Sequence, residues 1–200
     1  MLVRLYDKNP NPRELSKVAD ALNKGGVIIY PTDSVYAFGC KLNAVGGVER
    51  IAQLAGKDET TLTILCSSIS QAAEYARIDN AQFRVLKRNT PGPFTFILNA
   101  SGSIPDRVLA KRKTVGIRIP DSPIAQAIVE EVGMPLYTAS VKDPDSIVEY
   151  TTDPDLIWER YSHKIDVLVS ADYGHDEPTT IVDMTTDEPE IVRQGIGELR

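Results

Sequence analysis

The sequence is poor in the residues that build disulfide frameworks and metal centres. It has two cysteines, Cys40 and Cys66, and two histidines, His163 and His175. A small secreted domain held by disulfides uses more cysteines, and a zinc site needs its ligands in close groups. Because both cysteines lie in apolar stretches, we expect free buried thiols in a reducing cytosol.

Long apolar runs are also missing. No stretch of the sequence approaches the roughly 20 apolar residues that a membrane-spanning helix needs. The first residues, MLVRLYDKNP, lack the apolar segment of a secretory signal. We therefore expect a cytoplasmic protein with no membrane partner.

The sequence has no excess of positive charge. The net charge is −6 and the isoelectric point is about 5.0, whereas dedicated nucleic-acid-binding domains are usually strongly basic. The basic runs at 87–89 and 111–113 are typical of solvated helix ends or loops. The overall charge counts against a dedicated nucleic-acid-binding protein but does not exclude a local basic face.

Familiar catalytic motifs are absent as well. There is no G-x-x-x-x-G-K-[ST] and no G-x-G-x-x-G after a strand. No G-x-S-x-G motif occurs, and neither histidine lies near an evident serine triad. The sequence therefore gives little support to covalent catalysis or metal-dependent hydrolysis.

Helix and strand patterns alternate along the chain. Asn11 and Pro12 are suited to open a helix, and Gly25 is suited to end it. The expected helices are 12–24, 45–55, 70–76, 81–88, 123–132 and 154–162, and the expected strands are 27–30, 62–66, 90–98, 114–120, 135–140, 167–169, 180–184 and 190–195. This alternation predicts an α/β fold with an open mixed sheet flanked by helices. The length fits a single domain, 1–200.

Hydroxyl side chains gather at the ends of three predicted strands. They occur in Thr32-Asp33-Ser34, in Thr138-Ala139-Ser140 and in Thr179-Thr180. Ligands of open α/β sheets bind at the carboxyl ends of strands, where hydroxyls can bond amino, carboxyl or phosphate groups. The pattern predicts a small-molecule pocket.

Two arginines add fixed positive charge to this pattern. Arg118 lies inside the apolar strand TVGIRIP and needs an anionic partner, because an unpaired buried charge is costly. A protein carboxylate and a ligand's carboxylate or phosphate fit the local sequence equally well. Arg193 lies in VRQGIG, whose glycines either let the backbone approach a phosphate or end a strand.

Six motifs occur in one order: GGVIIYPTDSVYAFG, TPGPFTFIL, TVGIRIPDSP, PLYTAS, TTIVD and IVRQGIG. In this order the chain resembles the YrdC/YciO family across nearly its whole length, and its start, NPRELSKVADALNKGG, looks most like the YciO branch. The resemblance implies a twisted open mixed sheet around a large concave cavity, the YrdC/RibB-like fold.

The best-understood members of that family are threonylcarbamoyl-AMP synthases. They join L-threonine, bicarbonate and ATP, release pyrophosphate, and so supply an intermediate for modifying certain tRNAs. The resemblance therefore implies ATP as a substrate, accompanied by Mg²⁺, with no permanently bound cofactor and no metal held by the protein itself. The family has also been linked to double-stranded RNA binding.

The resemblance assigns roles motif by motif. The residues implied to bind threonine are Thr32, Tyr36, Arg118 and Thr138, with Arg118 holding the threonine carboxylate. The residues implied to contact the nucleotide are Lys57, Thr114, Ser140, Thr180 and Arg193. The residues implied to be catalytic are Lys57, Ser140 and Lys142.

Two motifs depart from those of the synthases. Synthases carry K-x-R before the strand that corresponds to 62–66. Here that region reads LAGKDETTL, so Lys57 takes the place of the arginine and Ala55 that of the lysine. Synthases also carry S-x-N, which here reads Ser140-Val141-Lys142. Loss of a positioned cation can lower a rate by roughly 10²–10³-fold, and a lysine reproduces neither the fork of an arginine nor an amide.

Three functions fit these observations. The first is a threonylcarbamoyl-AMP synthase, with activity weakened by the altered motifs. The second is a protein of the same fold that binds RNA, either tRNA or double-stranded RNA, or a nucleotide without efficient synthesis. The third is a relative that makes another acyl- or carbamoyl-adenylate. A homo-oligomer is compatible with all three.

Overall fold

The computed structural model describes residues 1–56, 63–104, 113–142 and 147–200. Its strands are β1 (Leu2–Arg4), β2 (Ile28–Tyr30), β3 (Ala37–Lys41), β4 (Thr63–Leu65), β5 (Phe94–Asn99), β6 (Thr114–Arg118), β7 (Leu136–Ser140), β8 (Val167–Ser170), β9 (Thr180–Asp183) and β10 (Glu190–Arg193). Its helices are α1 (Pro12–Asn23), α2 (Val45–Leu54), α3 (Ile69–Tyr75), α4 (Asn80–Asn89), α5 (Pro123–Val132), α6 (Glu149–Thr152) and α7 (Pro154–Tyr161).

The strands form one mixed sheet in the order β1-β8-β2-β3-β7-β4-β6-β5-β9-β10. The pairs β1/β8, β2/β8, β4/β6 and β5/β9 are parallel, and the other neighbouring pairs are antiparallel. The predicted open mixed α/β sheet is therefore confirmed.

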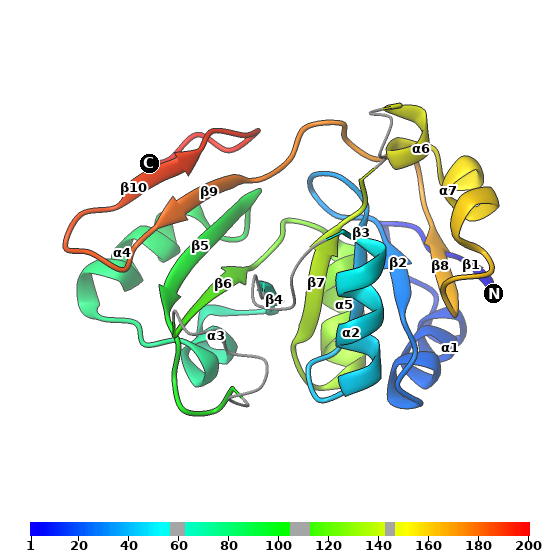
Figure 1. Cartoon of the computed structure of the whole chain (residues 1–200), viewed down its shortest axis with the longest axis horizontal. Helices are drawn as coiled ribbons and strands as arrows, with labels where there is room; N and C mark the ends of the chain where they lie inside the picture. Colours follow the sequence, from blue (N-terminus) through cyan, green and yellow to red (C-terminus); the bar gives the residue numbers. More distant parts are fainter. Residues whose placement is uncertain (57–62, 105–112, 143–146) are drawn as a thin grey trace.

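Helices cover both faces of this sheet (Figure 1). On one face, α1 and α5 bury apolar side chains such as Leu22 and Ile128 against β1, β2 and β8. On the other face, α2, α3, α4 and α7 contribute Ile51, Ala72, Leu86 and Ile157, respectively, to a second cluster. In Figure 1 the segment that links β8 to β9 passes along the upper edge of the sheet between α6 and β9.

Local sequence signals explain where the main helices begin and end. The Asn11 side chain accepts a hydrogen bond from the Arg13 amide at 2.9 Å, which caps α1. The Ser122 side chain likewise accepts from the Ala125 amide and caps α5. Gly133 ends α5 with φ of 71°, a conformation that favours glycine.

Three elements of the structure, β1, β3 and α6, are not among those expected from the sequence. The β3 segment contains Gly39, a residue type that is depleted in strands. Gly39 in fact lies within the sheet, opposite Ile28 on β2 and Thr138 on β7. A Cβ on Gly39 would stand 2.7 Å from the Tyr30 ring. The glycine therefore makes room for an aromatic side chain within a strand.

No helix within the described ranges is long and apolar enough to cross a membrane.

The buried acidic groups of the core predict a loss of stability at alkaline pH. Burial raises the pKa of the Cys40 and Cys66 thiols from 9.0 to about 12. Burial likewise raises the pKa of the Tyr30 and Tyr36 hydroxyls from 10.0 to about 12. Between pH 9 and 12 the unfolded chain releases protons that the folded chain keeps. The free energy of unfolding therefore falls as pH rises, by up to ~1.4 kcal/mol per pH unit for each group.

Urea unfolding at a series of pH values tests this prediction. We expect these groups to leave the free energy of unfolding unchanged up to about pH 8. Above their ordinary pKa values, the free energy of unfolding should decline steeply. The variant Cys66→Ala should show a shallower decline than the wild type, because one titrating group has been removed. An unchanged urea midpoint up to pH 11 would contradict the prediction.

Candidate functional site

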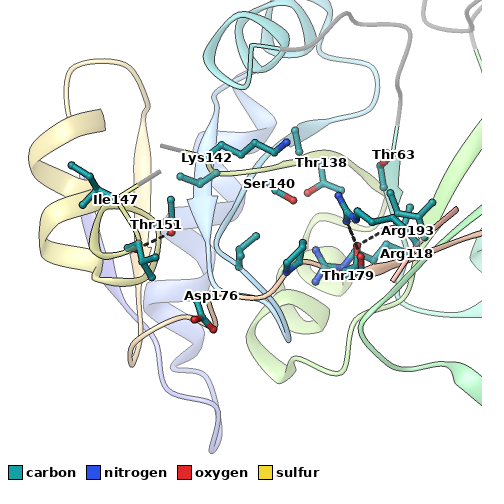
Figure 2. Close-up of a pocket in the computed structure, with 17 residues that line it drawn as sticks. Thr63, Arg118, Thr138, Ser140, Lys142, Ile147, Thr151, Asp176, Thr179 and Arg193 are labelled. Atoms are coloured by element: carbon teal, nitrogen blue, oxygen red, sulfur yellow. Dashed lines mark hydrogen bonds between the residues drawn. The ribbon is translucent and has the colours of Figure 1, made fainter. Parts of the chain in front are cut away.

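A cavity of about 310 Å³ lies against the central strands of the sheet. Strands supply Thr63, Thr95, Arg118 and Thr138 to its wall, and Arg193 completes that side. Ile147, Val148, Thr151 and Asp176 also line it. Figure 2 shows Arg118 and Arg193 facing Ile147 and Thr151 across the cavity, with Lys142 extended over it. Its volume lies at the lower end of the ~300–1,000 Å³ typical of ligand pockets.

Arg118 is the most deeply buried charge at this site. Its side chain is 4% exposed, and its Nη2 lies 2.6 Å from the Asp33 carboxylate, itself 8% exposed. The same Nη2 donates to the hydroxyls of Thr32 at 2.8 Å and Ser34 at 2.7 Å. The Asp33 carboxylate also accepts from the Asp121 amide at 2.8 Å. The anionic partner that the sequence required is therefore a protein carboxylate in this structure.

The guanidinium of Arg118 is not fully used by these contacts. Its Nε is buried and has no hydrogen-bond partner, and the three short contacts all converge on Nη2. An unpaired buried N–H is costly. An acceptor supplied from the cavity would relieve that cost, which makes Arg118 suited to bind an anion there.

The hydroxyl of Thr138 is committed to the sheet. It donates to the Phe38 carbonyl at 3.0 Å, and it lies 2.8 Å from the Tyr30 hydroxyl. The Tyr30 ring crosses Gly39 of β3 to reach it. Thr138 thus lines the cavity with a hydroxyl whose position is fixed by two partners.

Arg193 is held at the wall by the start of β9. Its Nη2 donates to the Thr179 carbonyl at 2.7 Å (Figure 2), and partial burial lowers the pKa of its guanidinium. The Thr179 hydroxyl lies 3.0 Å from that of Thr95. Loss of hydration at a cationic side chain favours an anionic ligand beside it.

The glycines after Arg193 allow the backbone to pack closely against neighbouring segments. A Cβ on Gly195 would stand 2.2 Å from the Pro178 carbonyl oxygen, and one on Gly197 would stand 2.7 Å from the Phe94 ring. These glycines bring the chain after β10 directly against the start of β9 and against β5.

Ser140 and Lys142, at the end of β7, both line the cavity. Lys142, Arg118 and Arg193 are its three cationic residues, and Asp176 is its one carboxylate, among the described lining residues. The described ranges contain no group of three His, Cys, Asp or Glu side chains that could hold a metal ion. The cavity is therefore suited to anionic ligands.

Four predicted residues lie outside the lining of this cavity, and a fifth is not described. Thr32 lines a neighbouring hollow of about 370 Å³ together with Asp33, and its hydroxyl donates to the Val35 carbonyl. Thr114 lies at the far end of β6 from Arg118, about four residues or ~13 Å along the strand. Lys57 falls outside the described residues.

Tyr36 and Thr180 have structural partners. The Tyr36 hydroxyl donates to the Asp172 carbonyl at 3.1 Å and so holds the segment after β8. The Thr180 hydroxyl donates to the Gly197 carbonyl and accepts from the Gly195 amide. Its neighbour Thr179 points to the cavity instead, because successive strand side chains face opposite sides.

Several residues that line the cavity were not predicted from the sequence. Thr95 lies between the buried residues Phe94 and Phe96. In a strand, this alternation of apolar and polar residues indicates that Thr95 faces the side opposite to the two rings, so the residue could have been found from the sequence. Thr63 carried a similar but weaker signal within LTILC. Thr151 and Asp176 lie in segments without a strand pattern, and only the folded arrangement brings them to the cavity.

Comparison with known proteins connects this geometry to a family. The sequence model of a family described as "Telomere recombination", which groups Sua5, YciO and YrdC, matches residues 20–195. The chain belongs to the Sua5/YciO/YrdC family. The family resemblance drawn from the six motifs is therefore confirmed.

YciO of Escherichia coli (strain K12), a family member described as uncharacterized, is 40% identical over 199 residues, which cover 98% of this chain and 96% of that protein. The crystal structure of E. coli YciO matches with a TM-score of 0.93 at 39% identity and covers 99% of this chain and 97% of that one.

Other family members are more distant. A Vibrio vulnificus (strain YJ016) protein named threonylcarbamoyl-AMP synthase is 26% identical over 186 residues, which cover 90% of this chain and 98% of that protein. Sua5 of P. abyssi, solved with L-threonine, matches with a TM-score of 0.85 at 24% identity. That match covers 100% of this chain and 62% of the Sua5 chain, and it shows a common fold.

Proposed function

We propose that the protein is a threonylcarbamoyl-AMP synthase that uses L-threonine, bicarbonate and ATP. The observation that carries the proposal is the convergence of Arg118, Lys142 and Arg193 on one cavity with a single described carboxylate. The family membership and the Vibrio vulnificus synthase support the choice of reaction. The P. abyssi Sua5 complex with L-threonine supports the choice of amino acid.

The proposed reaction has two balanced steps. The threonine amine attacks the bicarbonate carbon, a C–N bond forms, and water leaves to give a carbamate. A carbamate oxygen then attacks the α-phosphorus of ATP, the bond to the bridging β-phosphate oxygen breaks, and pyrophosphate leaves with the electron pair. Such chemistry depends on positioning and charge neutralisation more than on a protein nucleophile.

The cavity residues would have different roles in this reaction. Arg118 would hold the threonine carboxylate through the donor capacity that Asp33 leaves unused. Ser140, at the end of β7, would lie between the two substrates. Lys142 and Arg193 would face the phosphates and neutralise charge that moves onto the leaving group.

Magnesium would enter with the nucleotide. Mg²⁺ commonly binds substrate phosphates together with one or two carboxylates and several waters. Asp176 is the carboxylate that the described cavity lining offers for this role, and the triphosphate and water would supply the other oxygen ligands. The product would serve the modification of certain tRNAs.

Pyrophosphate release by the purified protein tests the proposal. With ATP, Mg²⁺ and bicarbonate present, release should depend on added L-threonine. Arg193→Ala should slow it by roughly 10²-fold or more if its cation neutralises transition-state charge. Release that is the same with and without threonine would overturn the assignment of the amino acid. No release despite binding of both ATP and threonine would favour the binding-protein alternative.

A further inference from the structure

Tyr36, just before β3, holds the segment that links β8 to β9. Its side chain is fully buried and is not part of the described cavity lining. The hydroxyl donates to the Asp172 carbonyl at 3.1 Å and accepts from the Ala171 amide at 3.3 Å. Burial raises the pKa of this hydroxyl to about 12, so it stays protonated and remains a donor at neutral pH. Both partners are backbone groups of the linking segment.

The same segment passes closely over the Tyr36 ring. A Cβ on Gly174 would stand 2.7 Å from Cδ2 of that ring. The Gly174 amide donates to the Thr152 carbonyl at the end of α6 at 2.9 Å, and the His175 amide donates to the Ser34 carbonyl at 3.3 Å. The segment has no regular secondary structure of its own, so these contacts and those of the Tyr36 hydroxyl determine its path.

This path leads directly to the cavity. Asp176, the residue after His175, lines the cavity, and so does Thr179, whose carbonyl holds Arg193. In the view of Figure 2, Asp176 lies on this segment between Thr151 and Thr179. Because the backbone immediately before Asp176 is held in place, its carboxylate has a restricted position at the cavity.

We propose that Tyr36 is a positioning residue, which acts through residues 171–175 to hold the Asp176 carboxylate where the metal of bound Mg²⁺-ATP needs it. Mg²⁺ demands nearly ideal octahedral geometry, so a carboxylate ligand must be placed accurately. Groups that orient such a ligand typically change metal affinity or activity by about 10–100-fold. The metal and the nucleotide in this proposal rest on the proposed function. The contacts of Tyr36 with the segment do not.

A simpler explanation predicts a different result. A buried tyrosine whose hydroxyl is hydrogen-bonded contributes to stability in any protein. If this were the only role of Tyr36, removing its hydroxyl would lower the stability of the fold. Any effect on Mg²⁺-ATP binding would then be the same whether or not Asp176 carries a carboxylate.

A double-mutant cycle separates these explanations by isothermal titration calorimetry with Mg²⁺-ATP. The proteins are wild type, Tyr36→Phe, Asp176→Asn and the double variant. We expect Tyr36→Phe to weaken Mg²⁺-ATP binding about tenfold in wild type and less than about twofold in the Asp176→Asn background. Threonine affinity should stay within about twofold of wild type. The matched control is Tyr75→Phe, at a partly buried tyrosine outside the described pockets, which should change neither affinity.

Amide hydrogen exchange without ligand tests the positioning itself. Ala171 loses its acceptor in Tyr36→Phe, so its amide and the nearby Gly174 amide should exchange at least about fivefold faster than in wild type or Tyr75→Phe. Gly174→Ala is a second variant. It keeps the hydroxyl but forces the segment away from the buried ring, and it should weaken Mg²⁺-ATP binding in the same Asp176-dependent way.

Each remaining outcome contradicts a different part of the account. Unchanged exchange in Tyr36→Phe would overturn the hold of Tyr36 on the segment. An equal loss of Mg²⁺-ATP affinity with and without the Asp176 carboxylate would overturn the route through Asp176. Faster exchange in a protein whose wild type does not bind Mg²⁺-ATP would overturn the proposed function, and with it the metal role of Asp176, while confirming the hold on the segment.

Discussion

Arg118→Ala is expected to abolish threonine-dependent pyrophosphate release. The substitution removes a cation whose buried Nε lacks an acceptor at the cavity wall. Loss of a buried, hydrogen-bonded charge partner typically costs ~2–5 kcal/mol in binding. Calorimetry should therefore show threonine affinity reduced by roughly 100-fold or more. Undiminished threonine binding by Arg118→Ala would refute the role assigned to this arginine.

The same substitution should destabilise the fold, so a second variant is needed. Arg118→Ala leaves the Asp33 carboxylate, 8% exposed, without its ion-pair partner. Removing one partner of a buried pair costs about 3–5 kcal/mol. The double variant Arg118→Ala with Asp33→Asn carries no uncompensated charge and should recover part of that stability. It should still fail to bind threonine, and this combination separates the binding role from the structural one.

Asp33→Asn alone is the complementary control. The arginine keeps its charge and its hydroxyl partners Thr32 and Ser34, so threonine binding should be retained. Arg118→Lys keeps the charge but loses the planar fork, and it should bind threonine more weakly than Asp33→Asn does. The reverse order would indicate that Asp33, not Arg118, contacts the ligand.

Gly195→Ala is expected to damage the nucleotide side of the cavity while sparing the threonine side. The new Cβ would stand 2.2 Å from the Pro178 carbonyl oxygen and 2.6 Å from Thr179 backbone atoms. Backbone cannot rotate away as a side chain can, so the start of β9 must shift. Overpacking of this kind costs about 1–3 kcal/mol.

That shift moves the anchor of Arg193, whose Nη2 donates to the Thr179 carbonyl. A displacement near 1 Å can lower a rate by ~10²-fold, and we expect a reduction of that order in pyrophosphate release with threonine affinity retained. Equal loss of threonine and ATP binding would show that the substitution disrupts the whole cavity rather than one wall.

Gly46→Ala is the matched control for this substitution. A Cβ at Gly46, inside α2, meets nothing within 4 Å, and alanine is favoured over glycine in helices. Thermal or urea unfolding should show a gain of about 0.5–1 kcal/mol. Pyrophosphate release should equal that of wild type.

The sequence specified the helices and most strands because their signals are local. Caps such as Asn11 and Ser122 and the apolar stripe of α1 depend on residues a few positions apart. The β3 strand was missed because the need for Gly39 comes from Tyr30 on another strand. A contact between distant segments leaves no periodic pattern in either one.

The site was predicted less completely than the fold, for a similar reason. The polar residues at the end of β7, including Ser140, mark the cavity, and so does Arg118. The choice of Asp33 as the partner of Arg118 depends on how the turn after β2 packs against β6. Thr179, and not Thr180, faces the cavity because of the register of β9 in the sheet. A shift of this register by one residue would turn the other side chain to the cavity.

The altered motifs also take on a different meaning in the folded chain. Ala55, which stands where related synthases carry a lysine, lines a second pocket of about 470 Å³ together with Arg160 and Lys164. Arg160 and Lys164 thus bring positive charge close to the position where Ala55 has none. A synthase of this kind would take these cations from an element other than the altered motif.

The most direct test of the account is product analysis with labelled bicarbonate. The purified protein would be incubated with ATP, Mg²⁺, L-threonine and bicarbonate labelled with carbon-13, and the products would be separated and weighed by mass spectrometry. The account predicts threonylcarbamoyl-AMP that carries the labelled carbon, absent when threonine is omitted and absent with Arg118→Ala. Adenylate products without the label, or no adenylate from a protein that binds both substrates, would contradict it.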